Sequence, residues 1–396
     1  MNVSRILNNI VSLVSFNIHK ARQSTLLFCV KNLLDGYSAT VTSIGRGIAG
    51  EAYEKHRIKR ADRFLSNRYL QNEIPGMYTV ISKLFCTSKR PVIAVDWSDM
   101  DDHKTHFLIR ASMLLEGRPV TLYQEVHTEG TKEKVKTHRQ FLKTLHAMLD
   151  DDCKPIIVTD AGFKSPWFRP VLELGWDIVG RVRKPHHYSL NECDNWQCIT
   201  ELYKKSTMRP GVFRSARIAK ANPFECTLVL VRQKSKGRQA KNKDGSRKCS
   251  KKSQKYAKGA QDPWLLATSL PVSGNIAKKV VAIYKHRMQI EEGFRDLKSN
   301  QFGLGFEYNK SVKTERLSVL IFLTTLASLV AILTGLSLTE SGQHRRFQAN
   351  TLKRRVLSFH TLGLRAWRQQ TQFSQDHWRA AMNTLKKMAI QAAYHA

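Results

Sequence analysis

Apolar residues recur at helical spacing in the first part of the chain and form short runs further on. From residue 1 to about 85 the helical spacing predicts a set of helices. From Pro91 the apolar runs become short and β-branched, which is typical of buried strands. We expect strands at 91–96, 106–114, 118–126, 154–159 and 176–182, and helices at about 137–149 and 165–174. Three antiparallel strands followed by alternating helices and strands predict a mixed α/β layer.

The same pattern divides the chain into regions. A mixed sheet with flanking helices, in a ribonuclease H-like order, is expected in two parts, at 86–183 and 271–340. Residues 184–270 break the alternation with short β-like runs, which predicts a β-rich insertion. The regions at 1–85 and 341–396 are predicted to be helical, and the second could serve a dimer or DNA contact.

One apolar stretch is long enough to cross a membrane. Residues 317–339 contain no charged residue, so length alone permits a transmembrane helix. Serine and threonine dilute this stretch, and a helix buried against a sheet explains it equally well. We therefore expect burial and no membrane partner.

The charge balance points to a polyanionic partner. The chain has 65 Lys and Arg against 32 Asp and Glu, a formal charge of +33, which is typical of proteins that bind nucleic acid. Residues 234–258 hold eleven cations and one acid, which predicts a flexible basic loop at 233–260. This loop either becomes ordered when it binds nucleic acid or stays a solvated, disordered loop without a partner. Lys59, Arg60 and Arg63 lie on a predicted helix of region 1–85, either as a DNA-binding surface or as a solvated basic face.

The cysteines and the N-terminus indicate the compartment. Seven cysteines form no CxxC pair and no regular framework, which favours reduced thiols. The first residues show no apolar core of a secretory leader. We expect a cytoplasmic, nucleoid-associated protein.

Two aspartates follow apolar runs. The run 90–95 is predicted to end at Asp96, and the run 154–159 at Asp160, so each strand would present a carboxylate at its C-terminal tip. An aspartate in this position also serves as an ordinary turn or cap residue.

A further pattern adds a third acid. Tyr284, Arg287, Glu291 and Lys298 lie three, seven and fourteen residues from the first, which puts them on one face of a single helix at about 100° per residue. Three acids can hold two divalent ions about 3.5–4 Å apart, the arrangement that cleaves phosphodiesters. Mg²⁺ prefers oxygen ligands, so Asp96, Asp160 and Glu291 are the predicted catalytic and metal-binding residues, with Mn²⁺ as a substitute metal.

These motifs together resemble a known family. Asp96 in V-D-W-S-D, Asp160 in D-A-G-F, and the Y-(2)-R-(3)-E-(6)-K spacing resemble the DDE cut-and-paste transposases of the insertion sequence four family. The resemblance covers most of the chain and weakens after about residue 355.

The resemblance implies a fold and a reaction. It implies a ribonuclease H-like core with a β-rich insertion, and a homodimer that binds terminal inverted repeats in a paired-end complex. It implies strand nicking, hairpin formation and opening, and strand transfer into target DNA. It implies that Asp96, Asp160 and Glu291 hold two Mg²⁺ ions. Tyr284, Arg287 and Lys298 would bind phosphates near the transposon end.

The hairpin step brings in one more residue. Trp264 resembles the tryptophan on which a flipped base stacks, although it also fits an ordinary core position. Met288 stands where some relatives have a second stacking aromatic.

Two other functions remain open from the sequence. One is a ribonuclease H-like DNA nuclease that cuts without joining strands. The other is a non-enzymatic basic scaffold for nucleic acid, in which only charge matters.

Overall fold

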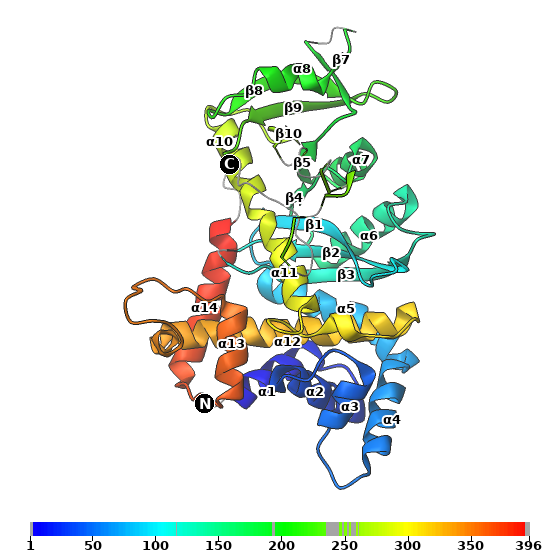
Figure 1. Ribbon diagram of the computed structural model, residues 1–396, viewed down its shortest axis with the longest axis vertical. Coiled ribbons are helices and arrows are strands. Elements are labelled where there is room, and N and C mark those ends of the chain that lie inside the picture. Colours follow the sequence, from blue (N-terminus) through cyan, green and yellow to red (C-terminus); the bar gives the residue numbers. More distant parts are fainter. Residues whose placement is uncertain are drawn as a thin grey trace. The chain divides into compact units, whose positions relative to one another are not determined.

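The structure is a computed structural model (Figure 1). The chain divides into two compact units. The structure describes residues 3–115, 117–191, 195–234, 245–247, 249–251, 253–254, 259 and 261–392. Unit 1 consists of Met1–Pro155 with Met288–Ala396, and unit 2 of Ile156–Arg287. Most of the predicted basic loop at 233–260 lies outside the described residues. The boundaries of the five predicted regions stay predictions.

Unit 1 begins with the expected helices. They are α1 (Val3–Val14), α2 (Lys20–Asp35), α3 (Val41–Gly47), α4 (Glu54–Leu65) and α5 (Arg68–Phe85). Helix α1 is strongly amphipathic and buries its apolar face, including Ile6 and Ile10. Helix α2 ends at Gly36, whose φ of 106° is the left-handed conformation that glycine adopts without strain.

A three-stranded antiparallel sheet follows in unit 1. Strands β1 (Val92–Asp99), β2 (His106–Met113) and β3 (Val120–Thr128) lie in the order β3-β2-β1, and helix α6 (Val135–Met148) comes next. The prediction that the first strand ends at Asp96 is wrong, because β1 continues to Asp99. The ladder with β2 extends to the pair Asp99 and Phe107, and this cross-strand pairing is not visible in the local apolar run.

One long helix forms the core of unit 1. Helix α12 (Thr314–Glu340) is the only helix of the described residues that is long and apolar enough to cross a membrane, and 94% of its most apolar window is buried inside the protein. In Figure 1 it runs between helices α1 and α2 on one side and β3 with α5 on the other. A helix that is apolar on all faces is buried on all faces, as expected here.

Shorter elements complete unit 1 around this helix. Helix α11 (Met288–Lys298) and the short 3-10 helix η1 (Phe306–Tyr308) precede α12. The short helix η2 (Gln343–Phe347), then α13 (Phe359–Arg368) and α14 (Gln375–Ala392), follow it. The C-terminal region is therefore helical, as predicted.

Unit 2 contains a second set of strands. Strands β4 (Ile156–Thr159) and β5 (Asp177–Val182) pair in parallel and are connected by α7 (Ser165–Glu173). The sheet continues in the order β5-β10-β9-β8-β6-β7. The remaining elements are β6 (His187–Leu190), β7 (Gln197–Cys198), α8 (Ile199–Lys204), β8 (Gly211–Ile218), β9 (Phe224–Val231), β10 (Trp264–Thr268) and α10 (Ile276–His286).

This architecture confirms the predicted fold class. Antiparallel strands, then a parallel strand pair joined by a helix, then a β-rich segment give a mixed α/β protein with flanking helices. The arrangement is consistent with a ribonuclease H-like fold.

The close contact between α12 and α13 generates a prediction about stability. A Cβ atom at Gly363 would overlap the carbonyl of Ala331, whereas a Cβ at Gly76 in α5 would meet nothing within 4 Å. Gly363→Ala should lower the free energy of unfolding by about 2–3 kcal/mol. Gly76→Ala should leave it unchanged or raise it by about 1 kcal/mol, because alanine favours a helix. Urea unfolding measures both, and equal stabilities would contradict the helix contact.

Candidate active site

Asp96 lies on the face of β1 that helix α11 covers. It pairs with Arg110 of β2, and directly opposed residues of an antiparallel pair project from the same face of the sheet. The Arg110 guanidinium lies 4.6 Å from the centre of the Phe294 ring on α11. Burial lowers the pKa of Arg110 to about 10, and its Nε donates to Oε1 of Gln124 at 2.7 Å. Asp96 therefore faces α11.

Glu291 lies in the first turn of α11, on the side that faces the sheet. It precedes Phe294 by three residues and Lys298 by seven, so the three side chains share one face of the helix. The Nζ of Lys298 donates to Oγ of Ser98 at 2.7 Å, and Ser98 projects from the same face of β1 as Asp96. The structure thus puts Asp96 and Glu291 on facing surfaces of β1 and α11.

The charge of Lys298 depends on its surroundings. Burial lowers the pKa of its ammonium group, the Asp99 carboxylate opposes this shift, and Arg110 adds to it. A second anion near Lys298 would favour the charged form.

Polar side chains attach α11 to the segment between β2 and β3. Gln289 forms hydrogen bonds with both backbone groups of Leu115, accepting from its N–H and donating to its carbonyl. Arg118 forms ion pairs with Asp296 at 2.8 Å and with Glu292 at 3.3 Å. The helix residues Gln289, Glu292 and Asp296 are spaced at three and four residues, so one polar face holds the helix in place.

Asp160 immediately follows β4 in unit 2, as predicted. Its Oδ1 accepts a hydrogen bond from the N–H of Gly162 at 2.8 Å. A Cβ at Gly162 would lie 3.0 Å from the same oxygen, so the close turn around the carboxylate favours glycine. The turn fixes the direction of the carboxylate.

Tyr284, Arg287 and Trp264 gather in unit 2. The rings of Trp264 and Tyr284 lie 4.9 Å apart in an edge-to-face arrangement, and the Arg287 guanidinium lies 5.6 Å from the Tyr284 ring. Burial raises the pKa of Tyr284, Arg287 and Arg181 lower it, and the nearby charge of Asp160 raises it further. Unit 2 therefore brings Asp160 into the electrostatic range of Tyr284. Trp264 is only half-buried, at the start of β10.

The prediction of one unbroken helix from Tyr284 to Lys298 is wrong. Helix α10 ends at His286 and α11 begins at Met288, with Arg287 between them. The N–H of Arg287 bonds to the carbonyl of Tyr284 only three residues back, which tightens the turn and interrupts the ladder of α-helical bonds. Spacing in the sequence could not show this interruption, which coincides with the boundary between the two units.

The three predicted acids are distributed over the two units. Asp96 and Glu291 belong to unit 1, and Asp160 belongs to unit 2. Within the described part of the chain, no group of three or more His, Cys, Asp and Glu side chains has metal-binding spacing. The three-carboxylate metal site stays a prediction.

The predicted basic helix is α4. Lys59 and Arg63 are exposed, whereas Arg60 is half-buried and donates to Oγ1 of Thr25 at 3.0 Å. Arg60 also lies over the Phe28 ring at 5.4 Å. Lys59 and Arg63 are therefore the members of this set that are most accessible to a partner.

Sequence reasoning missed Arg110, Arg118 and Gln289. Their spacing in the sequence carries no signal, because Arg110 and Arg118 belong to the strand region and contact a helix more than 170 residues away. The polar face of α11 at Gln289, Glu292 and Asp296 was the available hint.

Removal of Arg118 tests the attachment of α11. Arg118→Ala leaves the nearly buried Asp296 carboxylate without its cation and should lower the free energy of unfolding by about 3 kcal/mol. The matched control is Arg295→Ala, because Arg295 pairs with Glu292 from an exposed position and should cost less than about 1 kcal/mol. Urea unfolding measures both variants, and similar losses would show that the Arg118 pair does not anchor the helix.

A comparison with protein families identifies the chain at the level of its family. The model of the transposase DDE domain matches residues 87–330, more than half of the chain. This range includes Asp96, Asp160 and Glu291. A comparison with curated proteins found no match. The chain therefore belongs to the DDE transposase family.

Proposed function

We propose that the protein binds the terminal inverted repeats of an insertion sequence and carries out cut-and-paste DNA transposition. The match of residues 87–330 to the transposase DDE domain carries this proposal. The reaction would comprise strand nicking, hairpin formation and opening, and strand transfer into target DNA. The Y-(2)-R-(3)-E-(6)-K spacing supports membership of the insertion sequence four family. We also infer a resemblance to the transposase of the insertion sequences that flank the tetracycline-resistance composite transposon.

Asp96, Asp160 and Glu291 would hold two Mg²⁺ ions, with Mn²⁺ as a substitute. Their carboxylates supply the oxygen ligands that these cations prefer, so the donor set fits. When bound, such ions activate an attacking oxygen and stabilise a leaving one. Asp96 lies on β1 and Glu291 on α11, and these two elements pack against each other, which supports the assignment of both residues to one site.

Tyr284, Arg287 and Lys298 would hold phosphates of the transposon end. Arg287 can bind a phosphate through two parallel hydrogen bonds, whereas Lys298 acts as a point charge. Trp264 would stack on a base that leaves the helix in the hairpin step. Its half-buried position next to Tyr284 supports this role, because the indole is held by a protein contact and is still partly exposed to a ligand.

The remaining regions would bind DNA and a second copy of the chain. Lys59, Arg60 and Arg63 on α4 would contact the backbone of the inverted repeat, within a DNA-binding domain at 1–85. The region 184–270 would be the insertion domain, and 341–396 a dimer or DNA contact. The active form would be a homodimer in a paired-end complex, in the bacterial cytoplasm and associated with the nucleoid.

The carboxylates provide the main test. Asp96→Asn, Asp160→Asn and Glu291→Gln should retain binding to inverted-repeat DNA and lose cleavage by about 10³-fold or more, because each removes a proposed metal ligand. Gel shift measures binding, and a labelled-end cleavage assay measures cutting. Asp102→Asn is the control, because Asp102 is an exposed acid near β1 and should cut normally. The proposal fails if all three variants cut at the wild-type rate.

The same assay separates the alternatives. A ribonuclease H-like nuclease would cut but would not join a pre-cleaved end to target DNA, whereas a transposase would join it. A basic scaffold would bind DNA but would not cut it, so removing divalent metal with a chelator would change nothing.

Trp264 has a separate prediction. Trp264→Ala should slow hairpin formation by about tenfold or more while the first nick proceeds normally, because a flipped base loses its stacking partner. Trp264→Phe should recover most of the hairpin rate, since phenylalanine also offers an aromatic face. A slower nick, or no recovery by phenylalanine, would assign Trp264 a structural role beside Tyr284 instead.

A further inference from the structure

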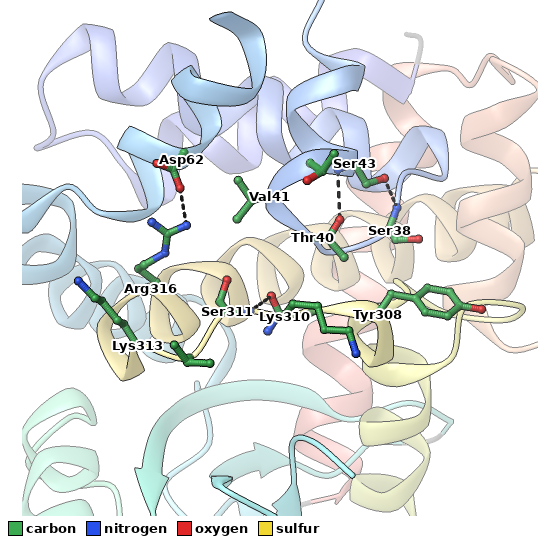
Figure 2. A pocket seen from close by; sticks show the side chains of 13 residues that line it. Ser38, Thr40, Val41, Ser43, Asp62, Tyr308, Lys310, Ser311, Lys313 and Arg316 are labelled. Atoms are coloured by element: carbon green, nitrogen blue, oxygen red, sulfur yellow. Dashed lines mark hydrogen bonds and ion pairs between the residues drawn. The ribbon is translucent and has the colours of Figure 1, made fainter. Parts of the chain in front are cut away.

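A cavity of about 590 Å³ lies in unit 1 between the N-terminal helices and the segment before α12. Figure 2 shows its two walls facing each other. Ser38, Thr40 and Ser43, around the start of α3, form one wall together with Asp62 of α4, and residues 308–316 form the other. The cavity therefore joins parts of the chain that are about 250 residues apart.

The charge of this cavity is positive. Its lining holds three cations, Lys310, Lys313 and Arg316, and one acid, Asp62. Arg316 neutralises that acid, with 2.6 Å between its Nη2 and Oδ1 of Asp62, and also donates to Oγ of Ser66 at 2.7 Å. Lys310 and Lys313 are exposed and form no ion pair with any residue that the structure describes. Two lysine charges thus remain available to an anion.

The uncharged lining consists largely of hydrogen-bond donors. Oγ of Ser43 accepts from the N–H of Ser38 at 3.0 Å, and Oγ1 of Thr40 accepts from the N–H of Ser43 at 3.1 Å. A hydroxyl that accepts in this way keeps its hydrogen for a further acceptor. Thr42 and Ser311 add two more hydroxyls to the lining. Phosphate oxygens are acceptors only, so hydroxyls beside lysines suit them.

The positive surface continues beyond the cavity along α4. Lys59 and Arg63 are exposed, and Lys59 neighbours both Asp62 and Arg63 on the helix surface, at three and four residues. At the rim, Tyr308 is 54% exposed and Val312 is 75% exposed. Cations that extend past the cavity, with apolar groups at its edge, fit a long polymer better than a small phosphate.

We propose that this cavity binds the phosphodiester backbone of double-stranded DNA through Lys310 and Lys313. The proposal rests on DNA being the substrate, as the proposed function states. One strand would pass between the α3 wall and the 308–316 wall and continue along Lys59 and Arg63. Contacts of this kind position DNA and do not read its sequence. The surface would therefore add affinity for any duplex.

The double variant Lys310→Ala with Lys313→Ala tests this surface. It should weaken binding to a labelled mixed-sequence duplex by about tenfold and reduce the slope of log affinity against log salt by about 2, because two phosphate contacts are lost. Fluorescence anisotropy over a series of salt concentrations measures both. Thermal unfolding should be unchanged, because both side chains are exposed.

A matched control removes the same charge elsewhere. Lys136→Ala with Lys143→Ala deletes two exposed lysines from one face of α6 and should change affinity and salt slope far less. Equal effects of the two double variants would mean that only total charge matters, which would overturn the proposal.

A second variant should act in the opposite direction. Asp62→Asn removes the only acid of the lining and releases the charge of Arg316, so duplex binding should become several-fold tighter with a steeper salt slope. No change or weaker binding would contradict the assignment. The proposed function is tested separately, by cleavage of inverted-repeat DNA. If the wild-type protein cuts this DNA but the cavity variants bind duplex as the wild type does, only the inference about the cavity is wrong.

Discussion

The docking of α11 on the three-stranded sheet of unit 1 determines where the candidate chemistry can occur. Arg110, buried between β2 and α11, lies over Phe294 and bonds to Gln124, which in turn bonds to Tyr78 and Thr325. This buried chain connects the sheet to α5, α11 and α12. Since its members are satisfied by one another, the loss of one would leave a polar group unpaired in the interior. The framework contacts α11, the helix that carries Glu291, through Phe294.

The outer attachment of α11 has a different physical character. Arg118 and Gln289 hold the helix from the side of the β2–β3 connection, through an ion pair that is nearly buried and through backbone hydrogen bonds. The face of α11 with Glu291 and Lys298, residues of the proposed site, and the anchoring face with Gln289, Glu292 and Asp296 lie on nearly opposite sides of the helix, at about 100° per residue. One helix can therefore carry reactive groups and be fixed in place, because its two polar faces have different partners.

The positive charge of the chain is neutralised in some places and not in others. Acids are few, and several of them neutralise particular cations: Asp62 pairs with Arg316, and Asp296 with Arg118. The lysines of the cavity at 308–316 and of α4 have no such partner among the described residues. Because the few acids pair with some cations and not with others, the unpaired lysines form local positive surfaces that suit phosphates. If the acids were spread evenly among the cations, no such surfaces would form.

The sequence by itself determined the elements and the residue types of the site. The apolar runs predicted the strands, the helical N-terminal region and the buried α12, because burial and periodicity are local properties of the chain. Asp160 after β4 followed from the same reasoning. Only the tertiary structure decided that β1 continues past Asp96, because that depends on pairing with β2. It also decided the interruption at Arg287, the contacts of Arg110 and Arg118, and the position of the cavity lysines, since these depend on how segments far apart in the sequence pack, which no local pattern records.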